Sequence, residues 1–226
     1  MELLPWDTQF FDVNIARARV RSVDALDSAI SAAREADIDC LYVVVPQADA
    51  PVLRAAIWAG GLLTALRLTL EHRAYRPAAQ PSSVRRATST DAARVVELSA
   101  ALASLSRFTH DPRFPRERID EMYRIWALND LHEGDVFVDV SGDCGLLTVS
   151  DHGDALAIGL VYVADSARGT GLGRALLDAA VARAGDRTLT VATDVRNVPA
   201  LRLYESAEFR TRSVEAILHL WLERPG

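Results

Sequence analysis

Apolar and polar positions in the first third of the chain follow the spacing of an α/β protein. Apolar residues recur at helical spacing over about Val23 to Ala36 and over Ala50 to Ala59, and an unbroken apolar run at Leu41 to Val45 predicts a buried strand. The pair Gly60 and Gly61 ends the second helix, and a strand pattern ending near Tyr75 follows. These elements are too few to make an independent α/β domain.

The rest of the chain predicts a mixed sheet. A short strand and a capping box precede two helices, and three strand patterns in a row then predict an antiparallel meander. A glycine-rich turn, a helix, a strand, a short helix and a final strand follow, so that a βαβ unit completes a sheet of the α/β (α+β) class. The expected elements are Val84 to Ala87, Thr88 to Asp91 (capping box), Ala92 to Leu102, Glu117 to Leu128, Asp135 to Val140, Gly145 to Ser150, Leu156 to Val163, Gly171 to Ala184, Leu189 to Thr193 and Ser213 to Leu222.

A linker divides the two parts. The segment Arg76 to Ser83 is rich in Pro and Ser and has no apolar periodicity, so we expect a smaller domain over residues 1–80 and a larger one over 81–226. The parts also suggest an internal repeat at an offset of 148 residues, in which Ala56 takes the place of Tyr204 and nothing matches the glycine-rich turn. The offset superposes Pro51, Leu53, Arg54 and Ala59 on Pro199, Leu201, Arg202 and Ala207.

Charge and composition exclude several classes of protein. Half of the 226 residues are hydrophobic, which is ample for a core, and the net charge is -6. All 25 basic residues are arginine and lie scattered among acidic ones, so we expect no nucleic-acid partner. The absence of lysine excludes Schiff-base catalysis and a Walker-type phosphate loop.

The two cysteines and the N-terminus bear on the compartment. Cys40 and Cys144 are far apart and lack CxxC spacing, which favours free thiols over a disulfide or a metal site. Met1 to Asp7 has no basic stretch followed by an apolar one, and no apolar run approaches about 18 residues. We therefore expect a cytoplasmic protein that has no membrane partner and no metal.

A glycine-rich turn carries the strongest chemical signal. Glycines at positions 169, 171 and 173 join an apolar strand to a helix, so that backbone N–H groups and the positive end of the helix dipole can surround a pyrophosphate. Arg168 and Arg174 add possible charge-assisted contacts. The spacing GxGxG departs from the GxGxxG of dinucleotide-binding folds, although Asp194 stands where a ribose-binding acid is expected. A turn that merely lets strand and helix pack is the alternative.

The run Arg168-x-x-Gly171-x-Gly173 with its apolar helix resembles the pyrophosphate motif of GNAT acetyltransferases, and Val84 to Thr88 with Asp91 resembles that family's first strand and helix. The resemblance covers residues 84–222 and implies a GNAT fold with acetyl-CoA as co-substrate. It also implies that the backbone of Tyr162 and Val163, on a splayed strand, binds the pantetheine and polarises the acetyl carbonyl. The implied cofactor-binding residues of the turn are Arg168, Gly169, Thr170, Gly171, Leu172, Gly173 and Arg174.

Asn197 and Tyr204 stand seven residues apart at the start and end of the predicted short helix, which puts them on one face. The same resemblance implies that Asn197 hydrogen-bonds the cofactor and that Tyr204 protonates the departing thiolate as the catalytic acid. A cap residue and a packing aromatic are the alternatives. The family commonly has Gly before Phe209, where this sequence has Glu208.

Two further segments bear on the acceptor. Leu4 to Phe11 and Ser106 to Phe108, with His110-Asp111-Pro112 and Trp126 downstream, resemble acetyltransferases that modify TDP-fucosamine and related nucleotide-linked amino sugars. This resemblance implies a degenerate GNAT-like first domain on a catalytic second one. It implies a small-molecule primary amine as acceptor, and Arg107 and Phe108 suit its phosphate and a ring face.

Several alternatives stay open. The acceptor is a protein amine or another small-molecule amine if the sugar interpretation fails, and a non-catalytic acyl-CoA-binding module is the rival to an enzyme. His110, Asp111 and Glu133 are equal candidates for the general base. A homodimer is the possible assembly of the chain.

Overall fold

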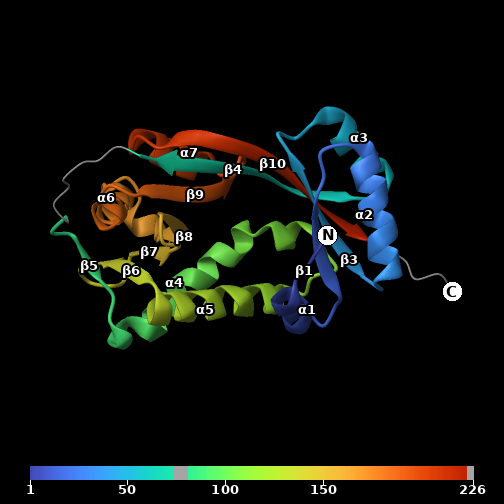
Figure 1. The fold of residues 1–226 in the computed structure, drawn as a ribbon. Helices are drawn as coiled ribbons and strands as arrows, with labels where there is room; N and C mark the ends of the chain where they lie inside the picture. The colour runs from blue at the N-terminus through green and yellow to red at the C-terminus, as the bar shows by residue number, and fades with distance from the viewer. Residues whose placement is uncertain (74–80, 223–226) are drawn as a thin grey trace.

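The sheet of this protein is mixed and continuous. In the computed structural model, which describes residues 1–73 and 81–222, the strands lie in the order β1-β2-β3-β10-β4-β9-β8-β7-β6-β5 (Figure 1). The predicted α/β class with a mixed sheet is therefore confirmed. The strands are β1 (Glu2–Leu3), β2 (Ile15–Arg19), β3 (Cys40–Pro46), β4 (Leu62–His72), β5 (Val84–Arg86), β6 (Asp135–Asp139), β7 (Gly145–Asp151), β8 (Ala155–Val163), β9 (Thr188–Asp194) and β10 (Arg210–Trp221).

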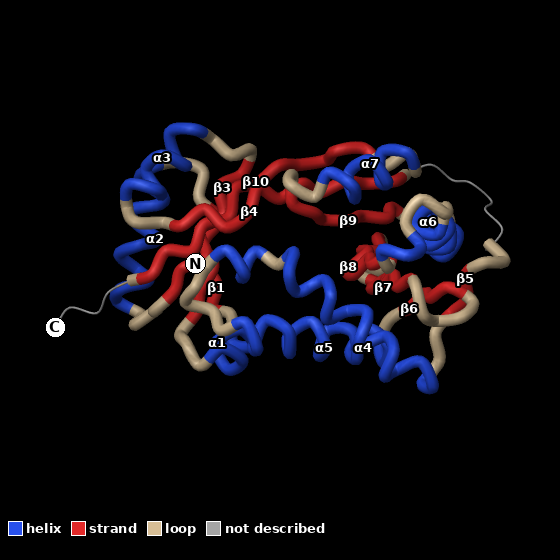
Figure 2. Tube along the Cα trace, turned by 180° about the vertical axis from the view of Figure 1, so that it is seen from behind, coloured by secondary structure: helices blue, strands red, loops and turns tan. Residues whose placement is uncertain are grey.

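Helices cover both faces of the sheet. On β3, Leu41 packs against α2 and α3, whereas Tyr42 packs on the opposite face with α1 and α5. On β8, Ile158 faces α6 and α7, and Leu160 faces α4 and α5. Figure 2 shows α4 and α5 running side by side below the sheet. The helices are α1 (Pro5–Phe11), α2 (Val23–Glu35), α3 (Ala50–Trp58), α4 (Ala92–Ala100), α5 (Arg116–Glu133), α6 (Leu172–Ala184) and α7 (Val198–Ser206).

Most predicted elements form, and the exceptions have physical reasons. The antiparallel meander β6-β7-β8, the parallel pairing of β8 with β9 and the capping box of Thr88 and Asp91 are confirmed. The sequence analysis missed α1, which has only seven residues, and β2, whose alternating Ala and Arg carry little hydrophobic signal. The predicted linker Arg76 to Ser83 and the strand end near Tyr75 fall largely on residues 74–80, outside the described residues.

The suggested internal repeat is confirmed by element boundaries. Strand β3, helix α3 and strand β4 begin at residues 40, 50 and 62, and β9, α7 and β10 begin at 188, 198 and 210, each 148 residues later. The helix caps repeat as well, because Asp49 accepts from the Val52 N–H and Asn197 accepts from the Ala200 N–H. Each half of the chain thus contains one copy of a β-α-β unit.

The final strand of each unit lies beside the other unit. β10 pairs with β3, and β4 pairs with β9, so β4 lies between β10 and β9. Glu215 pairs with Pro46, and Arg67, 148 positions earlier, pairs with Asp194, 148 positions after Pro46. Arg67 and Glu215 pair with each other where β4 meets β10, so an approximate two-fold axis passes between them. The division at residue 80 stays a prediction, with strands from both sides interleaved.

Candidate functional site

The glycine turn leaves a set of backbone donors open. It follows β8 through a short 3-10 helix, η4 (Asp165–Ala167), and ends at α6. Gly169 and Gly171 have φ of 79° and 91°, and a Cβ at either position would meet nothing within 4 Å. No hydrogen bond between described residues uses the backbone N–H of residues 169 or 171–174. Five donors near the positive end of a helix dipole are therefore without an acceptor among the described residues, as anion binding requires.

The third glycine and the second arginine have structural contacts. A Cβ at Gly173 would lie 3.1 Å from a Leu203 methyl group, so this glycine lets α6 approach α7. The Arg174 guanidinium lies 2.8 Å from Asp178 and donates to the Ser206 carbonyl at 2.8 Å. Arg168 is 65% exposed and pairs with Asp165 at 2.8 Å. Of the two arginines, Arg168 is therefore the one whose side chain is free to turn toward a bound anion.

Strands β8 and β9 are hydrogen-bonded to each other over only part of their length and then separate. β8 pairs with β9 only from Ala155 to Ile158, after which β8 pairs with β7 alone and β9 with β4 alone. A β-bulge marks the point of separation, where Gly159 and Leu160 both stand opposite Thr148. A Cβ at Gly159 would lie 2.8 Å from the Thr148 hydroxyl oxygen, so the bulge requires glycine. Beyond it, Tyr162 and Val163 lie on an unpaired strand edge that leads to the glycine turn.

Asn197 and Tyr204 lie on α7 as expected from their spacing. The Asn197 side chain caps the helix, and Tyr204 is buried, with its ring centroid 5.8 Å from that of Phe209. Burial raises the pKa of the Tyr204 phenol, so it keeps its proton at neutral pH. That protonation state suits an acid and also suits a packing role. Glu208, the departure from the family pattern, takes the left-handed conformation with φ of 67°.

The bulge has a half-buried carboxyl beside it that the sequence analysis missed. One Asp130 carboxyl oxygen lies 3.4 Å from the position of a Cβ on Gly159. Burial raises the pKa of Asp130, opposed by hydrogen bonding to Thr148 and Ser150. Asp130 follows Met122 and Trp126 at four-residue spacing on α5, so a charged residue in an otherwise apolar stripe was the available signal.

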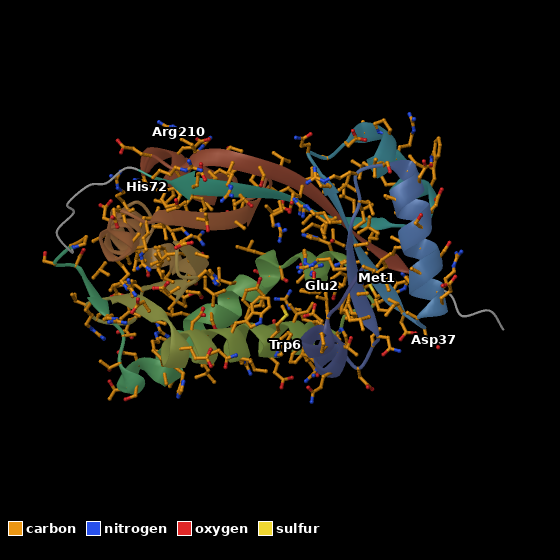
Figure 3. All side chains as sticks on the ribbon, in the orientation of Figure 1. Met1, Glu2, Trp6, Asp37, His72 and Arg210 are labelled. Carbon is orange, nitrogen blue, oxygen red and sulfur yellow. The ribbon has the colours of Figure 1, made fainter. Side chains whose placement is uncertain are left out.

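The two aromatic segments meet in one core cluster. The ring centroids of Phe11 and Phe108 lie 5.2 Å apart, and that of Trp6 lies 6.2 Å from that of Trp126 on α5. Figure 3 labels Trp6, which belongs to α1. Phe108 is only 4% exposed, so its ring packs within this core. It stacks on Arg107, whose guanidinium carbon lies 4.2 Å from the Phe108 centroid and 4.3 Å from that of Tyr42.

The candidate bases differ in their surroundings. Asp111 is buried and binds His219 at 2.9 Å and the Trp221 indole N–H at 2.8 Å. His110 and Glu133 are exposed. Asp111 is therefore engaged in a structural network, and Asp130 is the carboxyl that the fold places beside the parted strands.

Comparison with known proteins gives a family match over part of the chain and a similar fold. Residues 100–209 match the model of the acetyltransferase (GNAT) family. A functionally unknown conserved protein from Staphylococcus epidermidis has a TM-score of 0.72 at 13% identity, covering 98% of this chain and 90% of that one. A GCN5-related N-acetyltransferase from Sphaerobacter thermophilus has a TM-score of 0.55 at 20% identity, covering 83% of this chain, which spans 61% of that protein's length.

A tandem GNAT protein from the clavulanic acid biosynthesis pathway has a TM-score of 0.55 at 17% identity, covering 90% of this chain and 70% of that one. No curated protein matches the sequence. Within residues 1–73 and 81–222, no helix is long and apolar enough to cross a membrane, and no three His, Cys, Asp or Glu side chains are grouped for a metal ion.

Proposed function

We propose that this chain, whose residues 100–209 match the acetyltransferase (GNAT) family model, is an acetyltransferase that moves the acetyl group of acetyl-CoA to a primary amine. The observation that carries the proposal is the turn from Gly169 to Arg174, where five backbone N–H groups without acceptors stand at the end of two parted strands. In this proposal the turn binds the pyrophosphate, with Arg168, Thr170 and Leu172 contributing to it, and the edge of β8 at Tyr162 and Val163 binds the pantetheine.

The remaining residues have roles in the chemistry. The amine nitrogen attacks the acetyl carbonyl carbon, the C–S bond breaks, and the thiolate takes the phenolic proton of Tyr204. Asn197 hydrogen-bonds the cofactor from the start of α7. Asp130, beside the bulge, accepts the proton that the amine loses.

A charge placed in the turn tests the cofactor site. Thr170 is exposed and has an ordinary backbone conformation, so Thr170→Glu adds a negative charge beside the open N–H groups without straining the chain. We expect acetyl-CoA affinity by calorimetry to fall at least about tenfold through charge repulsion. Ser28→Glu, an exposed position on α2, carries the same charge change as a control. Equal affinity in both variants would remove the turn from the cofactor site.

For the acceptor we propose the amine of a nucleotide-linked amino-deoxysugar. Its support is the resemblance of Leu4 to Phe11 and Ser106 to Phe108 to enzymes with such acceptors, together with the contact between the two segments. The test compares kcat/KM for TDP-amino sugars, free amino sugars, polyamines and peptides. A preference for peptides or polyamines would refute the sugar, and binding of acetyl-CoA without thiol release would indicate a non-catalytic module.

We also propose that residues 1–80 are a degenerate GNAT-like domain and that the protein is cytoplasmic. The repeat at 148 residues supports the first proposal, and the free thiols of Cys40 and Cys144 support the second.

A further inference from the structure

A cavity lies on the sheet face covered by α1 and α5, between the two repeated units. It has a volume of about 120 Å³, and its polar lining consists of Asp7, Arg17, Tyr42, Arg67 and Arg107. These residues come from α1, from β2, β3 and β4, and from the 3-10 helix η3 (Arg107–His110). Three guanidinium groups thus face one carboxyl group.

Arg107 has an uncharged hydrogen-bond partner. Its Nη1 donates to Nε2 of His219, whose Nδ1 donates to the buried Asp111 carboxylate. Burial lowers the pKa of His219 to about 4, so the ring is neutral at pH 7. No carboxylate of a described residue forms an ion pair with Arg107, and among carboxyl groups Asp7 does most to raise the pKa of its guanidinium. Burial raises the pKa of Asp7, which weakens it as a counter-ion.

Two further donors in the lining are without partners. Tyr42 is 1% exposed, and its hydroxyl makes no hydrogen bond of normal geometry with a described residue, although Asp7 and Arg107 are close. The Nε of Arg67 is likewise buried without a partner, while its Nη2 binds Glu215 at 2.6 Å. Arg17 binds the exposed Glu2. Buried donors without acceptors are costly and rare, so this arrangement fits an oxyanion.

The cavity is close to the parted strands. Arg67 pairs with Asp194, at the end of β9 that has left β8. Arg67 lies two strands from β8 and three residues along β4 from Leu70, which pairs with Val191 at the point of separation. The volume of the cavity is well below the roughly 300 Å³ of sites for drug-sized ligands, so it has room for a compact group and none for a nucleoside.

We propose that the acceptor carries, besides its amine, a compact oxyanion, either a carboxylate or a single phosphate group, which binds in this cavity to Arg17, Arg67, Arg107 and the Tyr42 hydroxyl. The proposal rests on the proposed transfer of acetyl to a primary amine, because it assigns an anchor for the substrate of that reaction, and it competes with the nucleotide-linked amino sugar as the acceptor. β9 lies between Arg67 and β8, so acceptors are expected to carry the oxyanion several bonds away from the amine. Arg107, stacked between two rings, is the fixed member of the site.

Anion binding is tested without turnover. Thermal unfolding is followed with inorganic phosphate, acetate or chloride at matched ionic strength, in the presence of saturating CoA so that the glycine turn is occupied. We expect phosphate or acetate to raise the melting temperature more than chloride does. Arg67→Met should abolish this shift and Tyr42→Phe should reduce it, because each removes a donor from the cavity. Arg212→Met, on β10 and 56% exposed, should keep the full shift.

Either of two results would overturn the site. One is an equal effect of phosphate, acetate and chloride on the native protein. The other is an undiminished shift in both Arg67→Met and Tyr42→Phe. Because Tyr42→Phe removes only one oxygen, it remains informative if Arg67→Met fails to fold.

Turnover then identifies the oxyanion and separates the two proposals. Amines that carry a carboxylate are compared with their methyl esters, and amino-sugar phosphates are compared with the free amino sugars. We expect removal of the anion to lower kcat/KM at least about tenfold in the native protein and to have little effect in Arg67→Met. Acetylation of amines without regard to the anion would refute the anchor and leave the acetyltransferase proposal intact. An anion-dependent shift in melting temperature without acetylation of any amine would refute the acetyltransferase proposal and leave the anion site intact.

Discussion

Glu208 gives a test of the fold that needs no ligand. It follows α7 in the left-handed conformation with φ of 67°, and its counterpart 148 positions earlier is Gly60, with φ of 94°. The surrounding hydrogen bonds repeat as well, because Gly61 N–H donates to the Ala56 carbonyl and Phe209 N–H donates to the Tyr204 carbonyl. One turn is therefore built twice, once with the favoured residue and once without it.

The expected effect follows from the backbone. The left-handed conformation costs an L-residue about 1–2 kcal/mol, and the greater freedom of glycine in the unfolded chain offsets about 0.5–1 kcal/mol of that. Glu208→Gly should therefore raise the free energy of unfolding by about 0.5–1 kcal/mol relative to Glu208→Ala, which keeps the strain while removing the same side-chain contacts. Gly60→Ala should lower the free energy of unfolding by a similar amount through backbone strain. Steric overlap adds nothing, because the added Cβ would meet only a Leu220 methyl group at 3.9 Å.

Urea unfolding followed by circular dichroism measures these differences. A gain of about 1 kcal/mol corresponds to a shift of roughly 2–4 °C in the melting temperature for a chain of this length. Equal stability of Glu208→Gly and Glu208→Ala would refute the reasoning for α7. A Gly60→Ala variant as stable as the native protein would refute the equivalence of the two turns.

Three other predictions concern single groups. Tyr204→Phe should lower kcat by about 10² with an unchanged Kd for acetyl-CoA, and full activity would leave Tyr204 a packing role. Asp130→Asn should lower kcat/KM and abolish its acid limb, which in the native enzyme should lie above the usual Asp range because burial raises that pKa; an unchanged profile would exclude Asp130 as the base. His219 has a folded-state pKa of about 4, below its usual 6.5, so the unfolded state alone binds its proton between these values. Stability should fall as pH falls through this window by up to about 1.4 kcal/mol per unit, and a matching slope in His219→Gln would contradict the assignment.

Local sequence patterns predicted which helices and strands form better than they predicted which strands lie side by side in the sheet. Apolar periodicity and the glycine turn predicted the meander, α6 and β9, because each depends on residues close in sequence. The exchange of β4 and β10 was not predicted, since both strands have apolar residues on either face and nothing in one strand specifies a partner across the sheet. The pairing of Arg67 with Glu215, far apart in the chain, becomes visible only in the register.

The residues of the candidate site show the same difference between local patterns and contacts that depend on strand pairing. The turn, Asn197 and Tyr204 form a local pattern, and the structure brings them to the expected elements. Phe108 illustrates the limit, because an aromatic residue beside an arginine suits a ligand face or a core equally, and only its 4% exposure decides between them. Tyr42 and Arg67 gave no sequence signal, since their relation to Arg107 arises from strand pairing across the two halves.

A difference between the two halves of the chain bears on our proposal that only the second half has a cofactor site. In the first half, residues 20–22 connect β2 to α2, and the Ser22 hydroxyl accepts from the Ala25 N–H, so the helix caps its own first turn. In the second half, the longer connection 164–171 ends at Gly171, which has no side chain to cap α6. The first-turn N–H groups of α6 are left for an external acceptor, whereas in α2 the Ser22 hydroxyl accepts from one of them. This difference supports our proposal that the first half has lost the cofactor and keeps a role in the protein through the Arg17 and Tyr42 side of the anion cavity.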